Sequence, residues 1–315
     1  MVEKQIKNFN ILFLGGGKRV SIAKKFLESG KKLNLNVNLF SYELNRKVPF
    51  KIVGKVILGK KWSDKYILKD LDKIIRAKKI SFLIACVDQA TFLLPKINKL
   101  LKQRISITSD IEALNTVYDK EKIFYFCKKN KIDTISIKKS IPLIIKPKTG
   151  SASKNFYIIK SKKDLIKIEK KINLNKFIFQ EYVLGKEYSV DCYVSENNKI
   201  IFCVPRERIK VFQGEVISTK VIKNKRIIRV SENIIKKLNL SGPLNLQFIK
   251  KDNKFLLMDI NPRLGGGVLA SIEAGFDITK IMLQDIKNLK IRNKFHYKEL
   301  IMDRFMTEVF YETNN

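Results

Sequence analysis

Short apolar runs separated by turns and helix-forming stretches dominate the first third of the chain. The runs lie at Asn10–Leu14, Val37–Tyr42, Ser81–Val87 and Ile105–Thr108, and a helix is expected from the turn at residues 15–20 to about Leu33. A strand, a helix and a second strand in succession are typical of a βαβ unit with parallel strands. We therefore predict a Rossmann-like sheet over residues 1–108.

The pattern after residue 108 changes to helices followed by many short strands. Helix-starting residues at Ser109–Asp110 and Asp119–Lys122 precede the apolar stretch Ile123–Cys127. Strands are predicted at residues 142–147, 156–159 and 176–180, a lysine-rich helix at about 161–172, and further strands with one helix near 231–238 between residues 186 and 258. The whole pattern predicts an α/β protein.

The glycine run Gly15–Gly17 follows the first predicted strand. A dinucleotide-binding fingerprint requires G-x-G-x-x-G, and Val20 stands where the third glycine is expected. The pattern favours a tight turn that lets strand and helix pack closely. A dehydrogenase that uses a nicotinamide dinucleotide is the alternative.

Polar side chains gather on two strands in the last third of the chain. Asn245–Phe248 and Phe255–Met258 are joined by a polar turn, and the second strand leads into Asp259 and Asn261. Strand side chains alternate between two faces, so Asp259 and Asn261 share a face, and antiparallel pairing would bring Gln247 beside them. One carboxylate and two amides suit Mg²⁺ or Mn²⁺ that keeps water and phosphate oxygens as further ligands.

Arg263 lies two residues further along the same face and could serve as a fixed cation for phosphate or carboxylate. Pro262 ends the strand where the polar groups gather, as expected if this end faces a cleft. The alternative is a hairpin with solvated polar ends, which explains single residues but not the whole set.

The pattern N-x-Q-F…(D/E)-x-N-P-R over residues 245–263 resembles the metal-binding end of the ATP-grasp ligases, especially those similar to the large subunit of carbamoyl-phosphate synthase. Asp259 stands where the family most often has glutamate. Arg263–Gly267 resembles a subgroup associated with surface-polysaccharide or specialised amide synthesis.

This resemblance runs from about Ile11 to the C-terminus. It implies a Rossmann-like domain, residues 1–108, followed by a two-lobed ATP-grasp domain, residues 109–315, whose antiparallel sheets grip the nucleotide. The expected parts of the second domain are a lid at about 142–182, a catalytic lobe at about 183–290 and a closing segment at 291–315.

A loop of small residues after Lys146 is a candidate cover for phosphates, because glycine and serine let backbone N–H groups approach an anion. In the family this lysine and loop contact ATP phosphates, which implicates Lys146, Gly150, Ser151 and Ser153. Lys120 matches a second family phosphate contact. The alternatives are a plain turn, a lysine that extends to solvent from a strand end, and a solvated helix lysine.

A second nucleotide-binding segment follows the strand at 176–180. Glu181, Tyr182 and Val183 resemble the family's adenine-binding linker, and Glu187 resembles its ribose-binding carboxylate. Arg208 matches charged groups that face phosphates or the acceptor in the family. Surface charge is the alternative for Glu187, and cross-strand pairing with Glu207 or Glu215 is the alternative for Arg208.

Gly265–Gly267 is expected to begin a helix whose N-terminal N–H groups could bind an anion, or else to form a flexible turn. Arg304, near the C-terminus, could point into the substrate cavity or at solvent.

Composition narrows the classes of protein further. The chain has 315 residues, of which 45% are hydrophobic, so it can form two or three packed units. No apolar run approaches the ~20 residues that span a bilayer, and the polar start of the chain does not resemble a signal peptide, so we expect a cytoplasmic protein without membrane contact. The four cysteines, without CxxC spacing, are expected to be buried thiols. A single histidine, His296, argues against a histidine-based metal site or catalytic triad.

A formal net charge of +34 raises the alternative of a nucleic-acid-binding protein. The lysines are spread over every segment without interleaved aromatic residues, which is typical of a solvated surface rather than a specific nucleic-acid site. A general attraction for anionic substrates such as ATP is the expected consequence.

The sequence thus predicts an ADP-forming ligase that uses ATP and Mg²⁺ or Mn²⁺ to join a small-molecule carboxylate to an amine through an acyl phosphate. Lys146 and Arg263 are the predicted catalytic residues, and Gln247, Asp259 and Asn261 the predicted metal ligands. Carbamoyl-phosphate-type phosphorylation of bicarbonate or carbamate is the alternative within the fold; a non-catalytic nucleotide- or nucleic-acid-binding protein is the alternative outside it. The sequence leaves the substrates undetermined and is compatible with a homodimer.

Overall fold

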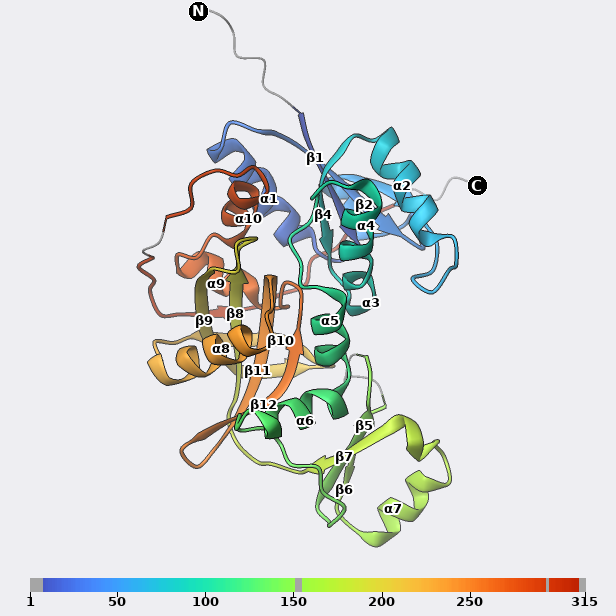
Figure 1. Cartoon of the computed structure of the whole chain (residues 1–315), viewed down its shortest axis with the longest axis vertical. Helices are drawn as coiled ribbons and strands as arrows, with labels where there is room; N and C mark the ends of the chain where they lie inside the picture. Colours follow the sequence, from blue (N-terminus) through green and yellow to red (C-terminus); the bar gives the residue numbers. More distant parts are fainter. Residues whose placement is uncertain (1–7, 151–154, 293–294, 312–315) are drawn as a thin grey trace, which may run out of the picture.

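The computed structural model of the chain describes residues 8–150, 155–292 and 295–311. The chain forms three sheets with flanking helices: a four-stranded sheet near the N-terminus, a six-stranded sheet in the middle and a three-stranded sheet at the opposite end (Figure 1). Parallel and antiparallel sheets follow one another along the chain as predicted, and the α/β fold class is confirmed.

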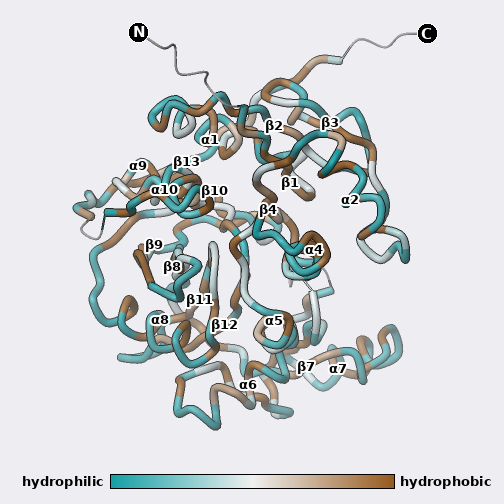
Figure 2. The backbone as a smooth tube through the Cα atoms, turned by 45° about the horizontal axis from the view of Figure 1, so that its top comes forward, coloured by the Kyte–Doolittle hydropathy of each residue, from teal (hydrophilic) through white to brown (hydrophobic). Residues whose placement is uncertain are grey.

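The N-terminal sheet is parallel and has the strand order β3-β2-β1-β4. Its two faces pack in different cores, because side chains alternate along each strand. Ile11 and Phe13 pack toward helix α1, whereas Leu12 and Leu14 pack toward α2 and α4. Figure 2 shows the hydrophobic stretches of β1 and β4 between these helices. The elements are β1 (Asn8–Leu14), α1 (Val20–Lys32), β2 (Asn36–Glu43), η1 (Pro49–Ile52), β3 (Lys55–Leu58), α2 (Ile67–Ala77), β4 (Ile80–Ala85), α3 (Asp88–Thr91) and α4 (Leu93–Leu101).

One predicted strand, Ile105–Thr108, is wrong, and the short edge strand β3 was not predicted. Only one backbone hydrogen bond outside regular elements joins this segment to β4, from Leu83 N–H to the Ile105 carbonyl at 2.7 Å. The Asn98 side chain instead accepts the Ile105 and Ser106 N–H groups at 3.1 and 3.2 Å. These donors are therefore satisfied by a side chain rather than by a strand ladder.

The six-stranded sheet is antiparallel, with the order β12-β11-β8-β9-β10-β13. One face packs against α5, α6 and α8, which begin at the capping residues Asp110, Asp119 and Asn224. The other face packs against α9 and α10. The elements are α5 (Ile111–Tyr118), α6 (Lys120–Lys129), β8 (Glu187–Val194), β9 (Ile200–Phe212), β10 (Glu215–Val221), α8 (Lys225–Lys237), β11 (Gly242–Lys251), β12 (Lys254–Asn261), α9 (Val268–Ala274), α10 (Ile278–Ile286) and β13 (Leu300–Asp303).

The three-stranded sheet lies where a lid was predicted. It consists of β5 (Leu143–Pro147), β6 (Tyr157–Ile159) and β7 (Phe177–Glu181), with α7 (Lys162–Glu169) and η2 (Leu174–Lys176) between β6 and β7. Ser161 and Asp164 form a capping box at the start of α7. A small core of its own, around Leu143, Ile145 and Ile159, holds this lobe together.

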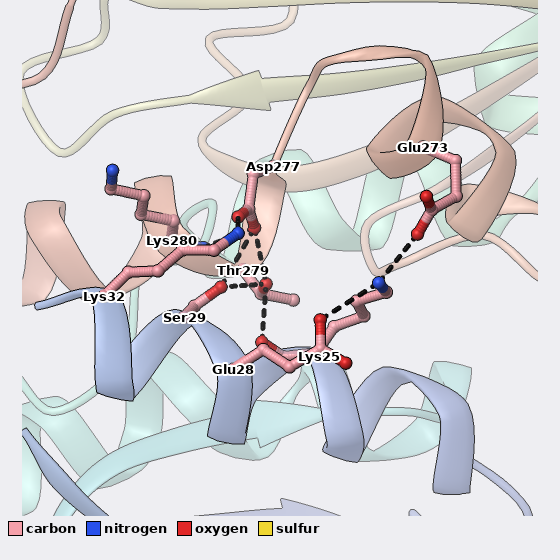
Figure 3. A network of polar contacts seen from close by, with 8 residues as sticks. All are labelled: Lys25, Glu28, Ser29, Lys32, Glu273, Asp277, Thr279 and Lys280. Carbon is pink, nitrogen blue, oxygen red and sulfur yellow. Dashed lines mark hydrogen bonds and ion pairs between the residues drawn. The ribbon is translucent and has the colours of Figure 1, made fainter.

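Polar contacts join helix α1 of the N-terminal sheet to α9, α10 and the segment between them (Figure 3). On α1, Lys25 Nζ lies 2.7 Å from Glu273 and Lys32 Nζ lies 3.1 Å from Asp277. Ser29 Oγ donates to Asp277 at 3.0 Å. Burial alone would raise the pKa of Asp277, but hydrogen bonds from Thr279 and neighbouring groups lower it. The same helices also pack in a hydrophobic core that the two sheets share.

All four cysteines are buried free thiols, as predicted. Within the described ranges, no helix is long and apolar enough to cross a bilayer.

Candidate active site

A cavity of about 1010 Å³ lies among the three sheets. Its wall includes residues from the lid lobe, from the six-stranded sheet and from the carboxyl ends of the N-terminal strands. This volume is at the upper end of the range for small-molecule sites, which is roughly 300–1,000 Å³.

The predicted metal ligands meet on one face of the β11–β12 hairpin. Gln247 is the register partner of Asp259, and Asn245 is the partner of Asn261. Leu246 and residues that alternate with these positions are buried on the other face, so period-two alternation directs Gln247, Asp259 and Asn261 into the cavity. A register shift after Gln247 leaves Met258 as an extra residue on β12, and Met258 also lines the cavity.

The contacts of these three residues suit an oxygen-ligated cation. Asp259 forms no ion pair with any described residue, and its Oδ1 accepts only the Ile260 N–H, at 3.1 Å. Asn261 Oδ1 accepts a hydrogen bond from Arg263 at 3.2 Å. In the described chain no group of three or more His, Cys, Asp or Glu residues could hold a metal. A cation here would therefore depend on amide, water and phosphate oxygens in addition to one carboxylate.

Arg263 connects this hairpin to the N-terminal sheet. Its Nε donates to Asp88 Oδ1 at 2.6 Å, and Asp88 follows the carboxyl end of β4. The guanidinium thus lies between the candidate metal ligand Asn261 and a carboxylate from the other sheet. Sequence reasoning missed Asp88, although its place directly after a buried strand was a usable signal.

Both predicted phosphate-binding lysines are buried rather than solvated. Lys146, on β5, is 6% exposed and lines the cavity; Lys120 is 3% exposed and donates to the Gly150 carbonyl at 2.7 Å. Burial lowers the pKa of Lys146 to about 8, while Asp259 acts to raise it and Lys120 to lower it. Gly150 has a left-handed φ of 87°. Ser151 and Ser153 lie outside the described residues.

The adenine-binding linker candidates, Glu181, Tyr182 and Val183, all line the cavity. Glu181 N–H donates to Ser136 at 2.9 Å and Tyr182 N–H to Pro142 at 3.4 Å. No hydrogen bond within the described ranges uses the Val183 N–H. The Glu181 carboxylate contacts Lys251 Nζ at 2.6 Å and so points toward the hairpin end.

Glu187 and Arg208 form an ion pair in the cavity wall. Arg208 Nε lies 3.1 Å from Glu187 Oε2 without hydrogen-bond geometry, and burial lowers the pKa of the guanidinium. Arg208 thus pairs across strands with Glu187 rather than with Glu207 or Glu215, which pair with Lys186 and Arg304.

A buried polar network that sequence reasoning missed supports the site. Arg206 and Asp191 are each 1% exposed and form a bidentate pair, with Nε–Oδ2 at 2.7 Å and NH2–Oδ1 at 3.1 Å. Asp191 also accepts from Asn245 at 2.8 Å and from Ser271 at 2.7 Å. An aspartate within the apolar run of β8 was the available signal, because a buried charge needs partners.

This network also explains the glycine run after Arg263. A Cβ on Gly267 would lie 2.3 Å from Arg206 NH1, and a Cβ on Gly265 would lie 2.7 Å from Asn245 Nδ2. A Cβ on Gly266 would meet Arg304 NH2 at 3.8 Å, an ordinary contact distance, and the Gly266 carbonyl accepts a hydrogen bond from Arg304. The run is therefore a close-packed turn before the seven-residue helix α9 rather than a flexible one.

Backbone N–H groups of the N-terminal glycine run are likewise hydrogen-bonded within the protein. Glu43 accepts hydrogen bonds from Ser41 Oγ at 2.6 Å and from the N–H groups of Gly16 and Gly17. Burial raises the pKa of Glu43 while these bonds act in the opposite direction. The N–H groups that a dinucleotide would need are thus taken, in agreement with a packing turn.

Comparison with known proteins gives the same picture. Residues 173–306 match the sequence model of a family described as "ATP-grasp in the biosynthetic pathway with Ter operon". The carbamoyl phosphate synthase large chain of Thermoanaerobacter sp. is 25% identical over 172 residues, which cover 50% of this chain and 16% of that protein. The chain therefore spans about a sixth of the length of this relative.

Two comparisons extend over most of the chain. The D-alanine–D-alanine ligase of Pelagibacter ubique is 22% identical over 281 residues, covering 82% of this chain and 86% of that protein. The crystal structure of N5-carboxyaminoimidazole synthetase from Staphylococcus aureus with ADP superposes with a TM-score of 0.74, at 19% identity, over 96% of this chain and 84% of that one. These similarities give residues 173–306 an ATP-grasp match, and they relate the chain to the carbamoyl phosphate synthase large chain and to D-alanine–D-alanine ligase.

Proposed function

We propose that the chain is an ADP-forming ligase that joins a carboxylate to an amine at the expense of ATP. The observation that carries this proposal is the convergence of Gln247, Asp259 and Asn261 with Lys146 and Arg263 on one cavity. Cationic side chains beside an oxygen-ligand site fit phosphoryl transfer, in which positioning and charge neutralisation supply most of the rate. Related ligases of D-alanine and N5-carboxyaminoimidazole support the reaction class.

Gln247, Asp259 and Asn261 would hold Mg²⁺ or Mn²⁺. The ion would neutralise charge on the ATP phosphates and bridge them to the protein. Asp259 suits this role because it is a cavity-wall carboxylate without a counter-ion among the described residues. Asn261 would have to exchange its hydrogen bond from Arg263 for the ion, which would release that guanidinium to act on the substrates.

The nucleotide would lie between the lid lobe, residues 142–182, and the six-stranded sheet. The unused Val183 N–H would donate to the adenine edge, and Glu187 would exchange Arg208 for the ribose hydroxyls. Arg208, Lys146 and Lys120 would then face the phosphates. We assign residues 1–108 to the domain that shapes the acceptor side and residues 109–315 to the nucleotide grip.

The reaction has two steps. A carboxylate oxygen of the substrate attacks the γ-phosphorus, and the bond from that phosphorus to the ADP oxygen breaks. Arg263 stabilises the charge that develops on the transferred group. The amine nitrogen then attacks the acyl carbon, phosphate leaves, and the amine gives up a proton. Closure of the lid lobe would exclude water from the acyl phosphate.

The test measures ADP and phosphate release over a panel of amino acids and amines. Asp259→Ala and Arg263→Ala are each expected to lower turnover by at least about 10²-fold, while far-UV circular dichroism and the unfolding midpoint stay close to those of the wild type. Asp72→Ala, at an exposed pair with Arg76, is the matched control and should retain full activity. Near-normal turnover in either site variant would refute the assignment.

Carbamoyl-phosphate-type chemistry is the second candidate, because the chain is similar to the carbamoyl phosphate synthase large chain over half its length. It predicts ATP hydrolysis that depends on bicarbonate and needs no other carboxylate. Phosphate release that bicarbonate stimulates in the absence of amino acids would favour it over amide formation.

A further inference from the structure

One wall of the cavity is built by the N-terminal sheet. It contains Arg19, which precedes helix α1, and the segment Cys86–Gln89, which follows β4. These residues come from adjacent parallel strands, whose carboxyl ends lie at the same edge of the sheet. The wall faces the side of the cavity that contains Arg263, where the acyl group would react.

Arg19 differs from the other arginines of this cavity. Each of the other three faces a carboxylate: Arg206 pairs with Asp191, Arg208 with Glu187 and Arg263 with Asp88. No hydrogen bond or ion pair joins the half-buried Arg19 guanidinium to another part of the described chain. A partly desolvated guanidinium is stabilised by a planar anion that accepts from two of its N–H groups.

No ion pair joins Arg19 to Glu43, the carboxylate that lies against the glycine turn. Glu43 is held by Ser41 and by the N–H groups of Gly16 and Gly17. The cation of Arg19 is therefore left for a ligand.

Arg19 and Arg263 line the same cavity, together with Cys86. Burial raises the pKa of the Cys86 thiol to about 11; the charges of Arg19 and Arg263 act to lower it, and that of Glu43 acts to raise it. Two cations that follow strands of two different sheets, β1 and β12, thus line one cavity.

We infer that the substrate of this site carries two anionic groups, one carboxylate that reacts beside Arg263 and a second anion that pairs with Arg19. This inference rests on the proposed ligase function and narrows its substrate to a dicarboxylate or a phosphorylated carboxylate. The cavity, at about 1010 Å³, has room for such a compound beside a nucleotide. Arg19 would act in binding and specificity, since the reacting carboxylate lies at Arg263.

The experiment measures thermal stability, and the binding affinity by calorimetry, in the presence of Mg²⁺ and the β,γ-imido analogue of ATP. The probes are matched pairs that differ in one anionic group: succinate with butyrate, glutarate with pentanoate, and 3-phosphoglycerate with glycerate. The first two pairs test a second carboxylate and the third tests a phosphate. The proteins are the wild type, Arg19→Gln, and Lys18→Gln, which removes the same charge from an exposed neighbouring side chain.

We expect at least one dianion to bind the wild type more tightly than its matched monoanion. Arg19→Gln should lower the affinity for that dianion about 10- to 100-fold and leave the affinity for the monoanion and the nucleotide analogue unchanged. Lys18→Gln should behave as the wild type.

Two outcomes would overturn the inference: a wild type that binds no dianion in preference to its partner, or a preference that survives unchanged in Arg19→Gln. The proposed function fails separately, if the nucleotide analogue with Mg²⁺ stabilises none of the three proteins.

Discussion

Arg263 Nε lies 2.6 Å from Asp88 Oδ1, and this ion pair joins the hairpin of candidate metal ligands to the carboxyl end of the N-terminal sheet. The side chains are 16% and 8% exposed, so the pair is largely shielded from solvent. Asp88 would act on the reacting centre through Arg263, which it contacts, and is therefore a positioning residue.

Asp88→Asn is expected to misplace Arg263 and to lower turnover about 10- to 100-fold, with a smaller effect on the KM for ATP. Coupled measurement of ADP release at saturating and limiting ATP separates the two effects. Asp72→Asn, which alters an exposed pair, serves as the control. A change in the KM for ATP alone would show that Asp88 does not position Arg263.

Lys146 should destabilise the fold because burial lowers its pKa from 10.5 to about 8. Between these two values the unfolded chain binds more protons at this position than the folded chain, so the free energy of unfolding rises with pH across this window. Below about pH 8 the side chain is charged in both states, and the destabilisation has its full size. Lys146→Met should therefore raise the free energy of unfolding at pH 7 by up to about 3 kcal/mol.

Urea denaturation of the wild type and Lys146→Met at pH 7 and pH 10 measures this effect. The difference between the proteins should shrink at the higher pH, and the variant should lose affinity for Mg·ATP. Lys163→Met, on the exposed surface of α7, should change neither quantity appreciably. A variant less stable than the wild type at pH 7 would contradict the burial argument.

The glycine turn offers a test of packing. Gly267→Ala would place a Cβ 2.3 Å from Arg206 NH1, whereas a Cβ at Gly266 would lie at an ordinary contact distance of 3.8 Å from Arg304 NH2. Gly267→Ala should therefore lower the free energy of unfolding by about 2 kcal/mol or more, and Gly266→Ala should stay within about 0.5 kcal/mol. Denaturant titration of the two variants decides the point, and equal stabilities would show that the turn is not tightly packed.

Asp191 should be the most sensitive carboxylate for stability, because Arg206 is buried and depends on it. Asp191→Ala is expected to cost about 3–5 kcal/mol, measured by the shift in denaturant midpoint. The double variant Asp191→Leu with Arg206→Leu should recover part of this loss, since no buried charge then lacks a partner. A single variant as stable as the wild type would mean that water replaces the lost partner.

The local sequence pattern was sufficient to predict that the polar hairpin residues share one face. Alternation along β11 and β12 is a local property of strands, so the common face of Gln247, Asp259 and Asn261 followed once the hairpin was recognised. The prediction of a strand at Ile105–Thr108 was wrong because apolar residues indicate burial but not the hydrogen-bond partner. The N–H groups of Ile105 and Ser106 donate to the Asn98 side chain instead of to a neighbouring strand. Burial of Lys120 and Lys146 could not be read from sequence, since lysines occur throughout this chain.

The sequence alone determined the order of the sheets, the buried cysteines and the group of polar residues around Asp259, because periodicity, turns and a spaced motif are properties of neighbouring residues. Only the tertiary structure decided the partners of the charges. Asp88 and Arg263 lie 175 positions apart, and Arg206 finds Asp191 on another strand. Such pairs form because an unpaired charge is costly to bury, and the packing of the sheets decides which charges meet.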